Sequence, residues 1–349
     1  MPLFAGRVLL RDEVMEGWLE VEEGKAKAWG EGPAPERPDA TGWIVPAFVN
    51  AHTHVGDSFL RGVPGKPTTV AALVGPGGWK QQHLQAAKPA AVAKGIQDYV
   101  AEMGAIGTAA FLDFREGGVE GAAALSALAP DLDPRPIILG RPRKNGFAHA
   151  EADALLAVCD GVGLSALRDF GDPADVEAWA EAAHRKRKTF ALHASEAKRE
   201  PLGAVLALEP DFLVHCTQAT KRELQDIADA EVPIAICPRS NAYFGMKTPA
   251  PQMRDAGVQV AVGTDNGMLQ DGNLLAELAL LHLWDPKTPL EELLRMATWN
   301  GRAVAGLPAA WPPKQGAPLD LVVLPGDPLP RPADRRPGFT GAATVPESP

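Results

Sequence analysis

Two histidines one residue apart end an apolar stretch near the N-terminus of the sequence. His52 and His54 close the run that begins at Val45, whose composition is typical of a strand buried on both faces. Side chains at i and i+2 of a strand point to the same side, so the two imidazoles aim together while Thr53 points away. Converging imidazoles can share one metal ion, since zinc takes histidine nitrogens as ligands at about 2.0–2.1 Å. A His-x-His pair alone is a weak signal, and its interpretation depends on residues further along the chain.

Three more polar residues of suitable type lie at the ends of apolar runs. His193, His215 and Asp265 each interrupt or close a strand-like hydrophobic run. Three imidazoles and a carboxylate form a shell that suits a divalent cation and leaves room for a water molecule. The structural alternative is a buried histidine bonded to the backbone, and it applies most directly to His215. The repeated placement at run ends favours a metal site.

Composition narrows the classes of protein that the chain can belong to. Its 349 residues are 46% hydrophobic and 22% charged, with a formal net charge of -10, which argues against nucleic acid and anionic membranes as partners. No apolar run reaches the roughly 20 residues that span a bilayer, and the first residues do not resemble a signal peptide. Cys159, Cys216 and Cys237 are predicted to be free buried thiols. We therefore expect a cytoplasmic protein, and the oligomeric state, a homo-oligomer included, is left open.

The apolar runs predict the fold that positions these residues. Eight strand-like runs, most of them followed by a helical pattern, occur at 45–54, 109–114, 136–140, 162–167, 189–193, 212–215, 233–237 and 258–265. Strands that alternate with helices predict an α/β protein with a parallel sheet, and eight repeats predict a closed (β/α)8 barrel of the TIM type. An open doubly wound sheet is the alternative, disfavoured because no Gly-x-Gly-x-x-Gly follows the first strand. In such a barrel the polar run ends would all open onto one face.

The two ends of the chain predict a smaller unit. Short strand-like segments at 6–10, 16–21 and 25–29 precede the first barrel strand, and a late strand at 320–324 has no helix after it. These segments can join in one small sheet. Residues 331–349 are rich in Pro, Gly and charge, and we expect them to form a poorly ordered tail.

Several segments together resemble the amidohydrolase superfamily over nearly the whole chain. They are 46–54, 193–196, His215, 238–241, 263–265, 297–303 and 316–324. The resemblance is greatest to the mononuclear deaminase branch, which includes cytosine, guanine and S-adenosylhomocysteine-type deaminases. It implies a small β-sandwich built from both termini, and a division into residues 1–46 (sandwich), 47–305 (metal-dependent barrel) and 306–349 (sandwich and tail). The dinuclear branch is disfavoured, because run 162–167 offers no lysine as a bridging ligand.

The same resemblance implies roles for the polar residues. His52, His54, His193 and Asp265 would be the ligands of one divalent ion, zinc in the first place and ferrous iron as the alternative. His215 would contact the attacking water or the substrate, and Asp265 would assist as a base.

Glu196 turns a metal site into a deaminase hypothesis. It follows His193 by three residues, within reach of the same site. Deamination of an amidine-like carbon requires a hydroxide, which a bound metal supplies by lowering the pKa of water towards about 7. It also requires a group that carries protons to the ring nitrogen and to the leaving amine, which a carboxylate can do. The structural alternative is a carboxylate favoured by the positive end of a helix dipole.

Loops that follow the strands are expected to select the substrate. Segment 61–85 is predicted to be a mobile lid in which Trp79 stacks on a planar heterocycle or seals the loop onto the barrel. Arg141 is predicted to bind a carboxylate or phosphate of the substrate, with a solvated rim position as the alternative. Ser240 and Asn241 are predicted to contact the substrate because related enzymes do so there.

The sequence therefore predicts a metal-dependent aminohydrolase that acts on a small heterocycle such as a purine, pyrimidine or pteridine. One alternative keeps the site and changes the bond, to another C–N bond or to C–Cl, and Glu196 argues against it. The other alternative is a non-catalytic binding protein on the same fold, and the presence of the full ligand set argues against that.

Overall fold

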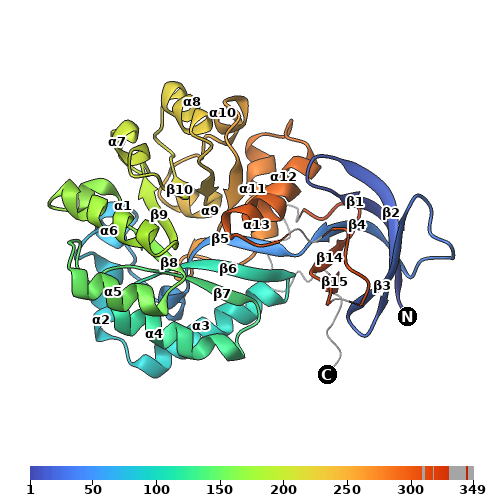
Figure 1. Ribbon diagram of the computed structural model, residues 1–349, viewed down its shortest axis with the longest axis horizontal. Coiled ribbons are helices and arrows are strands. Elements are labelled where there is room, and N and C mark those ends of the chain that lie inside the picture. Colours follow the sequence, from blue (N-terminus) through green and yellow to red (C-terminus); the bar gives the residue numbers. More distant parts are fainter. Residues whose placement is uncertain (309–310, 317, 330–342, 345–349) are drawn as a thin grey trace.

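The computed structural model describes residues 1–308, 311–316, 318–329 and 343–344, which form two sheets (Figure 1). The larger is a parallel sheet in the order β12-β11-β10-β9-β8-β7-β6-β5-β13. Its strands are β5 (Phe48–His54), β6 (Thr108–Arg115), β7 (Arg135–Gly140), β8 (Gly161–Leu164), β9 (Thr189–Ala194), β10 (Phe212–His215), β11 (Ile234–Ile236), β12 (Val260–Val262) and β13 (Asp265–Asn266).

The two outermost strands of this sheet are parts of one stretch of chain, and that closes the sheet. β12 pairs with β11, and β13 pairs with β5 at the opposite end of the strand order. Only Gly263 and Thr264 separate β12 from β13, and their backbone amides donate to the carbonyl groups of Ile236 and His52. The eighth predicted run thus supplies both β12 and β13, and the curled parallel sheet of a TIM-type barrel is confirmed.

Helices connect the strands and cover the outside of the barrel (Figure 1). They are α1 (Val70–Leu73), α2 (Trp79–Ala86), α3 (Pro89–Gly104), α4 (Gly118–Leu128), α5 (His149–Val158), α6 (Pro173–Arg185), α7 (Leu202–Leu206), α8 (Lys221–Asp229), α9 (Pro238–Tyr243), α10 (Ala250–Asp255), α11 (Leu274–Trp284), α12 (Leu290–Ala297) and α13 (Trp299–Val304), with 3-10 turns η1 (Val55–Leu60), η2 (Ala129–Asp131) and η3 (Leu167–Asp169). Local sequence sets several helix starts. Asp172 caps α6 by accepting from the amide of Ala174, and Thr220 and Glu223 form a capping box at α8.

The first predicted barrel strand, 45–54, is in fact two strands in two different sheets. β4 (Ala40–Pro46) belongs to the terminal sheet, and β5 begins at Phe48. The backbone changes partner at Ala47, whose amide donates to Asp320, while the amide of Phe48 donates to Gly107 in the barrel. Both strands are buried where they meet, so the apolar pattern continues across the change of sheet.

The terminal strands form one six-stranded sheet beside the barrel, in the order β15-β14-β4-β1-β2-β3 (Figure 1). Its other strands are β1 (Leu3–Leu9), β2 (Val14–Glu22), β3 (Lys25–Glu31), β14 (Leu321–Leu324) and β15 (Ala343–Thr344). Both ends of the chain contribute strands as expected, but two stacked sheets, and therefore the predicted β-sandwich, are not confirmed. Of the predicted tail 331–349, all except β15 lies outside the described residues. None of the helices in the described part of the chain combines the length and apolarity that crossing a bilayer requires.

Trp179 of α6 is an anchor between the helical layer and the barrel. Its side chain is fully buried, and its indole N–H donates to the carbonyl oxygen of Gly146 at 3.0 Å. We expect Trp179→Ala to lower the free energy of unfolding by about 3–5 kcal/mol, because it removes a large buried side chain and leaves a cavity. Urea unfolding followed by circular dichroism measures the change. Leu283→Ala is the control, since Leu283 is 56% exposed and should change stability by less than about 0.5 kcal/mol; equal losses in both variants would contradict the expectation.

Candidate functional site

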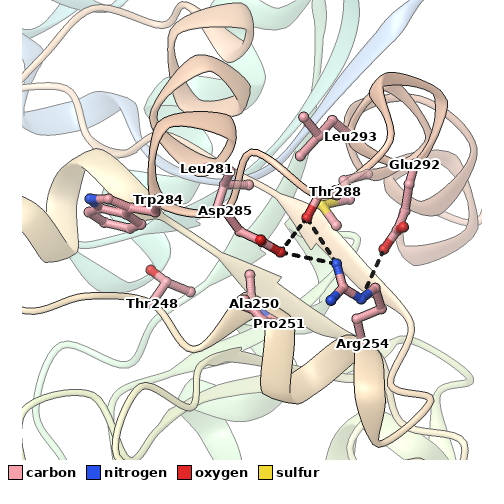
Figure 2. A pocket seen from close by; sticks show the side chains of 11 residues that line it. Thr248, Ala250, Pro251, Arg254, Leu281, Trp284, Asp285, Thr288, Glu292 and Leu293 are labelled. Atoms are coloured by element: carbon pink, nitrogen blue, oxygen red, sulfur yellow. Dashed lines mark hydrogen bonds and ion pairs between the residues drawn. The ribbon is translucent and has the colours of Figure 1, made fainter.

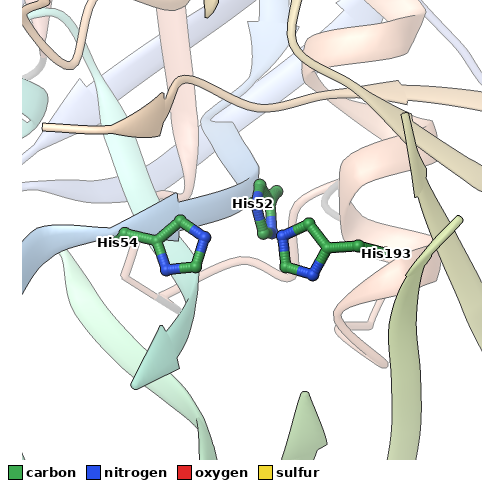
Figure 3. Close-up of side chains that lie close together, drawn as sticks. All are labelled: His52, His54 and His193. Atoms are coloured by element: carbon green, nitrogen blue, oxygen red, sulfur yellow. The ribbon is translucent and has the colours of Figure 1, made fainter. Parts of the chain in front are cut away.

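The polar residues that end the barrel strands meet at one edge of the barrel. His52 and His54 lie at the end of β5, His193 in β9, His215 at the end of β10 and Asp265 at the start of β13. Ligand atoms of His52, His54 and His193 lie within 4.8 Å of one another, and so do those of His52, His215 and Asp265. Figure 3 shows the side chains of His52, His54 and His193 close together, with the ring of His52 edge-to-face with the other two. This edge, at the carboxyl ends of the strands, is where barrel enzymes place their chemistry.

The backbone turns sharply at three of these strand ends. Ser195, His215 and Asp265 have φ angles of 46°, 71° and 59°. Left-handed backbone is uncommon for residues other than glycine, and such conformations cluster at functional sites, where the surrounding structure enforces them. The turns place polar side chains at the barrel mouth where an ordinary strand would continue with apolar ones.

Hydrogen bonds fix the orientation of two of the histidines. The Nδ1 atom of His54 lies 3.0 Å from the carbonyl oxygen of Phe114, and that of His193 lies 2.8 Å from the carbonyl oxygen of Leu164. A carbonyl only accepts, so Nδ1–H donates in each ring and Nε2 keeps a free lone pair. The ring of His52 is fully buried, and neither of its nitrogens has a hydrogen-bond partner among the described residues. Buried polar atoms without partners require an explanation, and a metal ion at this point supplies one.

The protonation states also suit a cation. Burial lowers the pKa of His52 to about 3 and that of His193 well below its usual value, so both rings are neutral at neutral pH. Burial by itself would raise the pKa of Asp265, but the close approach of His52, followed by His215 and His54, holds it well below the usual range. The Oδ1 atom of Asp265 lies 3.3 Å from Nε2 of His52 and 3.5 Å from Nε2 of His54. Imidazoles with free lone pairs and one carboxylate match the donor set that zinc takes in proteins.

His215 is oriented from behind by an amide. The Oδ1 atom of Asn241 accepts from the hydroxyl groups of Thr217 at 3.4 Å and Thr248 at 2.8 Å, which directs the amide nitrogen towards Nδ1 of His215 at 3.4 Å. With Nδ1 as the acceptor, the proton of His215 is on Nε2. That atom lies 3.7 Å from Oε1 of Glu196, so the N–H bond of His215 and the carboxylate face the same space.

A cavity of about 340 Å³ opens beside these groups, a size that suits a small molecule. His54, His193, Glu196, His215 and Asp265 all line it. Burial raises the pKa of Glu196 above its usual value, partly offset by His215. A carboxyl group with a raised pKa accepts and returns protons more readily near neutral pH than an exposed one does. The cavity therefore holds a candidate metal site and a candidate proton carrier side by side.

The four residues predicted to bind substrate fall in different places. Arg141 lines the cavity. Ser240 and Asn241 are fully buried behind Asp265 and His215, and neither is among the described residues that line the cavity. Trp79 stacks on His83 with ring centroids 3.7 Å apart and is likewise not among the lining residues. Of the two roles proposed for Trp79, the geometry favours sealing the loop onto the barrel.

Some residues of the site were not singled out by the sequence. Ser165 lines the cavity, and its hydroxyl is buried without a partner among the described residues. Glu200 accepts from the amide of Ser195 at 2.9 Å, and its own amide donates to the Ser195 hydroxyl at 2.9 Å, which braces the loop that carries Glu196. Lys80 of α2 is 3% exposed and lines the cavity. A single serine, glutamate or lysine in a loop gives no pattern that distinguishes it from a solvated residue.

A second cavity, between α10 and the α11–α12 connection, is lined by a structural ion pair (Figure 2). The guanidinium group of Arg254 donates to Asp285 at 3.2 Å and to Thr288 at 2.9 Å. The cavity volume is about 10 Å³, room for no more than about one water molecule. The larger cavity is therefore the candidate active site.

Ser240 should matter through Asp265. Its hydroxyl donates to Oδ2 of Asp265 at 2.5 Å, and the carboxylate needs this bond to present Oδ1 to the histidines. We expect Ser240→Ala to weaken zinc binding about 10–100-fold, the usual cost of losing an outer partner of a ligand. Isothermal titration of the metal-free protein with zinc measures it. Ser126→Ala, on the exposed face of α4, is the control, and a Ser240→Ala affinity equal to that of the control would contradict the expectation.

The chain forms a parallel barrel with histidines and a carboxylate at the carboxyl ends of its strands. This arrangement is typical of metal-dependent barrel enzymes. The model of the amidohydrolase family matches residues 135–340, more than half of the chain. A putative aminohydrolase of Archaeoglobus fulgidus is 33% identical over 279 residues, covering 80% of this chain and 78% of the relative. A 5-methylthioadenosine/S-adenosylhomocysteine deaminase of Halobacterium salinarum is 27% identical over 358 residues, covering 88% and 79%.

Among solved structures, an atrazine chlorohydrolase of Arthrobacter aurescens in complex with zinc is similar in fold. It superposes with a TM-score of 0.68 at 20% identity and covers 88% of this chain and 83% of its own. The chain belongs to the amidohydrolase family, as its sequence predicted.

Proposed function

We propose that the protein is a metal-dependent hydrolytic deaminase that releases ammonia from a small cyclic amidine-type substrate such as a purine, pyrimidine or pteridine. The observation that carries the proposal is the position of Glu196, on the wall of the cavity with its carboxylate 3.7 Å from Nε2 of His215. The relatives named as an aminohydrolase and as a deaminase support the same reaction class.

His52, His54, His193 and Asp265 would hold one divalent ion, zinc or ferrous iron. When bound, such an ion supplies a hydroxide for hydrolysis by lowering the pKa of a water molecule towards about 7. The protein contributes the neutral imidazoles, the ionised carboxylate and the cavity beside them.

Glu196 would carry the protons. Its carboxylate would accept one proton from the attacking water and pass it to the ring nitrogen of the substrate. It would then accept a second proton from the hydroxyl group that has added to the carbon and pass it to the leaving amine, which departs as ammonia. His215 would donate the hydrogen on Nε2 to the oxygen that develops negative charge. The amide nitrogen of Asn241 would support this role, because it donates a hydrogen bond to Nδ1 and so keeps the ring proton on Nε2. Asp265 would act as a second base from the other side of the site.

Arg141 would bind the part of the substrate that points away from the reacting carbon. Its guanidinium group lies at the cavity wall, 3.6 Å from Oε1 of Glu116 and 17% exposed. That leaves donors available for an acceptor or an anionic group on the substrate. Ser240 and Asn241 would serve by positioning Asp265 and His215, and direct contact with the substrate by these two, or by Trp79, is the less favoured arrangement.

A panel of amino-substituted purines, pyrimidines and pteridines, assayed for ammonia release by the metal-loaded protein, tests the proposal. Release of ammonia from at least one compound, abolished by chelation and restored by zinc or iron, is the expected result. Release of chloride from a chloro-heterocycle without any ammonia release would instead support the reaction named for the Arthrobacter protein. Metal binding with no turnover on any compound would point to a binding protein on this fold.

A further inference from the structure

Lys80 is a buried cation in a segment that is otherwise partly exposed. It lies in α2, between the first two barrel strands, and only 3% of its surface is exposed. Burying an ammonium group is costly unless anionic and polar partners surround it. Its Nζ donates to Oδ1 of Asn266 at 2.9 Å and forms ion pairs with Oδ2 of Asp57 at 3.0 Å and Oε1 of Glu116 at 2.5 Å. One amide oxygen and two carboxylate oxygens thus surround the ammonium group.

The three partners follow three neighbouring strands of the barrel. Asp57 lies in η1 directly after β5, Glu116 comes directly after β6, and Asn266 is the last residue of β13. In the sheet these strands are adjacent, in the order β13-β5-β6. β5 and β13 carry His52, His54 and Asp265, three of the four proposed ligands. One ammonium group therefore joins the strand ends that must hold the metal donors in register.

Glu116 links the lysine to a ligand directly. Its Oε1 atom lies 2.8 Å from Nδ1 of His54, whose hydrogen bond goes to the carbonyl oxygen of Phe114. A carboxylate beside the outer nitrogen of a metal-binding histidine orients the ring and makes it a better donor. Without Lys80, the partly exposed carboxylate of Glu116 and the buried one of Asp57 would lie close to one another without the ammonium group between them, and the Coulomb repulsion would favour movement of one away from the site.

Lys80 also fastens one wall of the cavity. Val70, Ala71, Val74 and Pro76, all from the segment between η1 and α2, line the cavity together with it. Segment 61–85, which was expected to be a mobile lid, includes Lys80, and this buried cation is bound to three strand ends beneath it. The attachment makes the wall and the metal edge parts of one assembly.

We infer that Lys80 is a positioning residue that acts through Glu116 on His54 and holds the 70–86 wall against the metal-ligand edge. The inference rests on the proposed metal site and adds to it a residue outside the ligand shell. Lys80 is not one of the proposed ligands, and its effect is measured first as metal affinity.

The test is a double-mutant cycle on zinc affinity, measured by titration of the metal-free full-length chain. Lys80→Met keeps the length and apolar character of the side chain and removes the charge, and Glu116→Gln keeps the shape and removes the negative charge. Each single variant should bind zinc about 10–100-fold more weakly. The double variant should be no weaker than the poorer single one, because both changes break the same path. Lys66→Met, in the same segment and half-exposed, is the matched control and should bind zinc as wild type does.

A second measurement works without metal. Hydrogen exchange of the metal-free protein should show the α2 amides exchanging at least about tenfold faster in Lys80→Met than in Lys66→Met, while helices away from the wall, such as α8, are unchanged. Zinc affinity or α2 exchange equal to that of wild type, or losses that multiply in the double variant, would overturn the inference. Should wild type bind zinc and Lys80→Met bind it equally, only the inference fails. If wild type binds no zinc or iron, the proposed function fails, and α2 exchange still decides the role of Lys80.

Discussion

Replacing Glu196 with glutamine should lower kcat about 10²–10⁴-fold, the range that a positioned general acid–base contributes. Glutamine has nearly the same shape as glutamate but can neither accept the first proton nor return the second. Because Glu196 is not among the proposed ligands, the variant should bind one divalent ion per chain as wild type does. Steady-state ammonia release and metal analysis of the same preparation measure both quantities. Glu177→Gln, on the exposed side of α6, is the control and should retain full activity.

The pH dependence of wild type gives an independent reading of the same carboxylate. Burial raises the pKa of Glu196 above 4.5, the usual value, and His215 offsets part of the rise. Only the ionised carboxylate can accept the first proton, so kcat/KM should rise with pH through that raised pKa, and the acid limb should lie above pH 4.5. An acid limb below that value, or a Glu196→Gln variant as active as wild type, would remove Glu196 from the proton path.

The barrel was predictable because its signal is local and repeated. Each barrel strand is buried along most of its length, so each appears as a short apolar run. Polar residues such as His193 and His215 at the run ends break that pattern where a strand reaches the barrel mouth. Eight runs predict a barrel, and the carboxyl ends of all barrel strands lie at one face. These two facts place the histidines together without knowledge of any contact.

The features that the sequence did not reveal depend on partners far along the chain. The apolar run 45–54 gives no sign that Pro46 belongs to one sheet and Phe48 to another, because the change is made by backbone bonds to Asp320 and Gly107. Lys80, between an aromatic and two glutamines, has the pattern of a solvated loop lysine. Its burial depends on two carboxylates and an amide. Their positions in the sequence range from 23 residues before Lys80 to 186 residues after it.

The same limit applies to the residues that lie behind Asp265 and His215. Ser240 and Asn241 were predicted to contact substrate. The resemblance that placed them at the site did not indicate how deeply their side chains are buried. The structure puts both behind the groups that face the cavity, where each holds a neighbour in one orientation. Sequence position locates a residue at a strand end, but whether its side chain faces the ligand or supports another side chain depends on packing.

Removing the ring of His52 should abolish metal binding altogether. His52 belongs to both groups of converging ligand atoms, and neither of its ring nitrogens has a hydrogen-bond partner among the described residues. We expect His52→Leu, which keeps most of the volume, to weaken zinc binding by more than about 100-fold, beyond the cost of losing an outer partner. Ammonia release should fall below detection. His282→Leu, on the exposed side of α11, should change neither property.

Thermal unfolding separates loss of the ligand from general damage. A metal that binds only the folded protein stabilises wild type by about 2.7 kcal/mol at a free concentration 100 times its Kd. Wild type should therefore unfold at a higher temperature with zinc than with a chelator, whereas His52→Leu should unfold at the same temperature in both. A zinc-dependent shift that persists in His52→Leu would place the ion away from this ring and overturn the proposed ligand set.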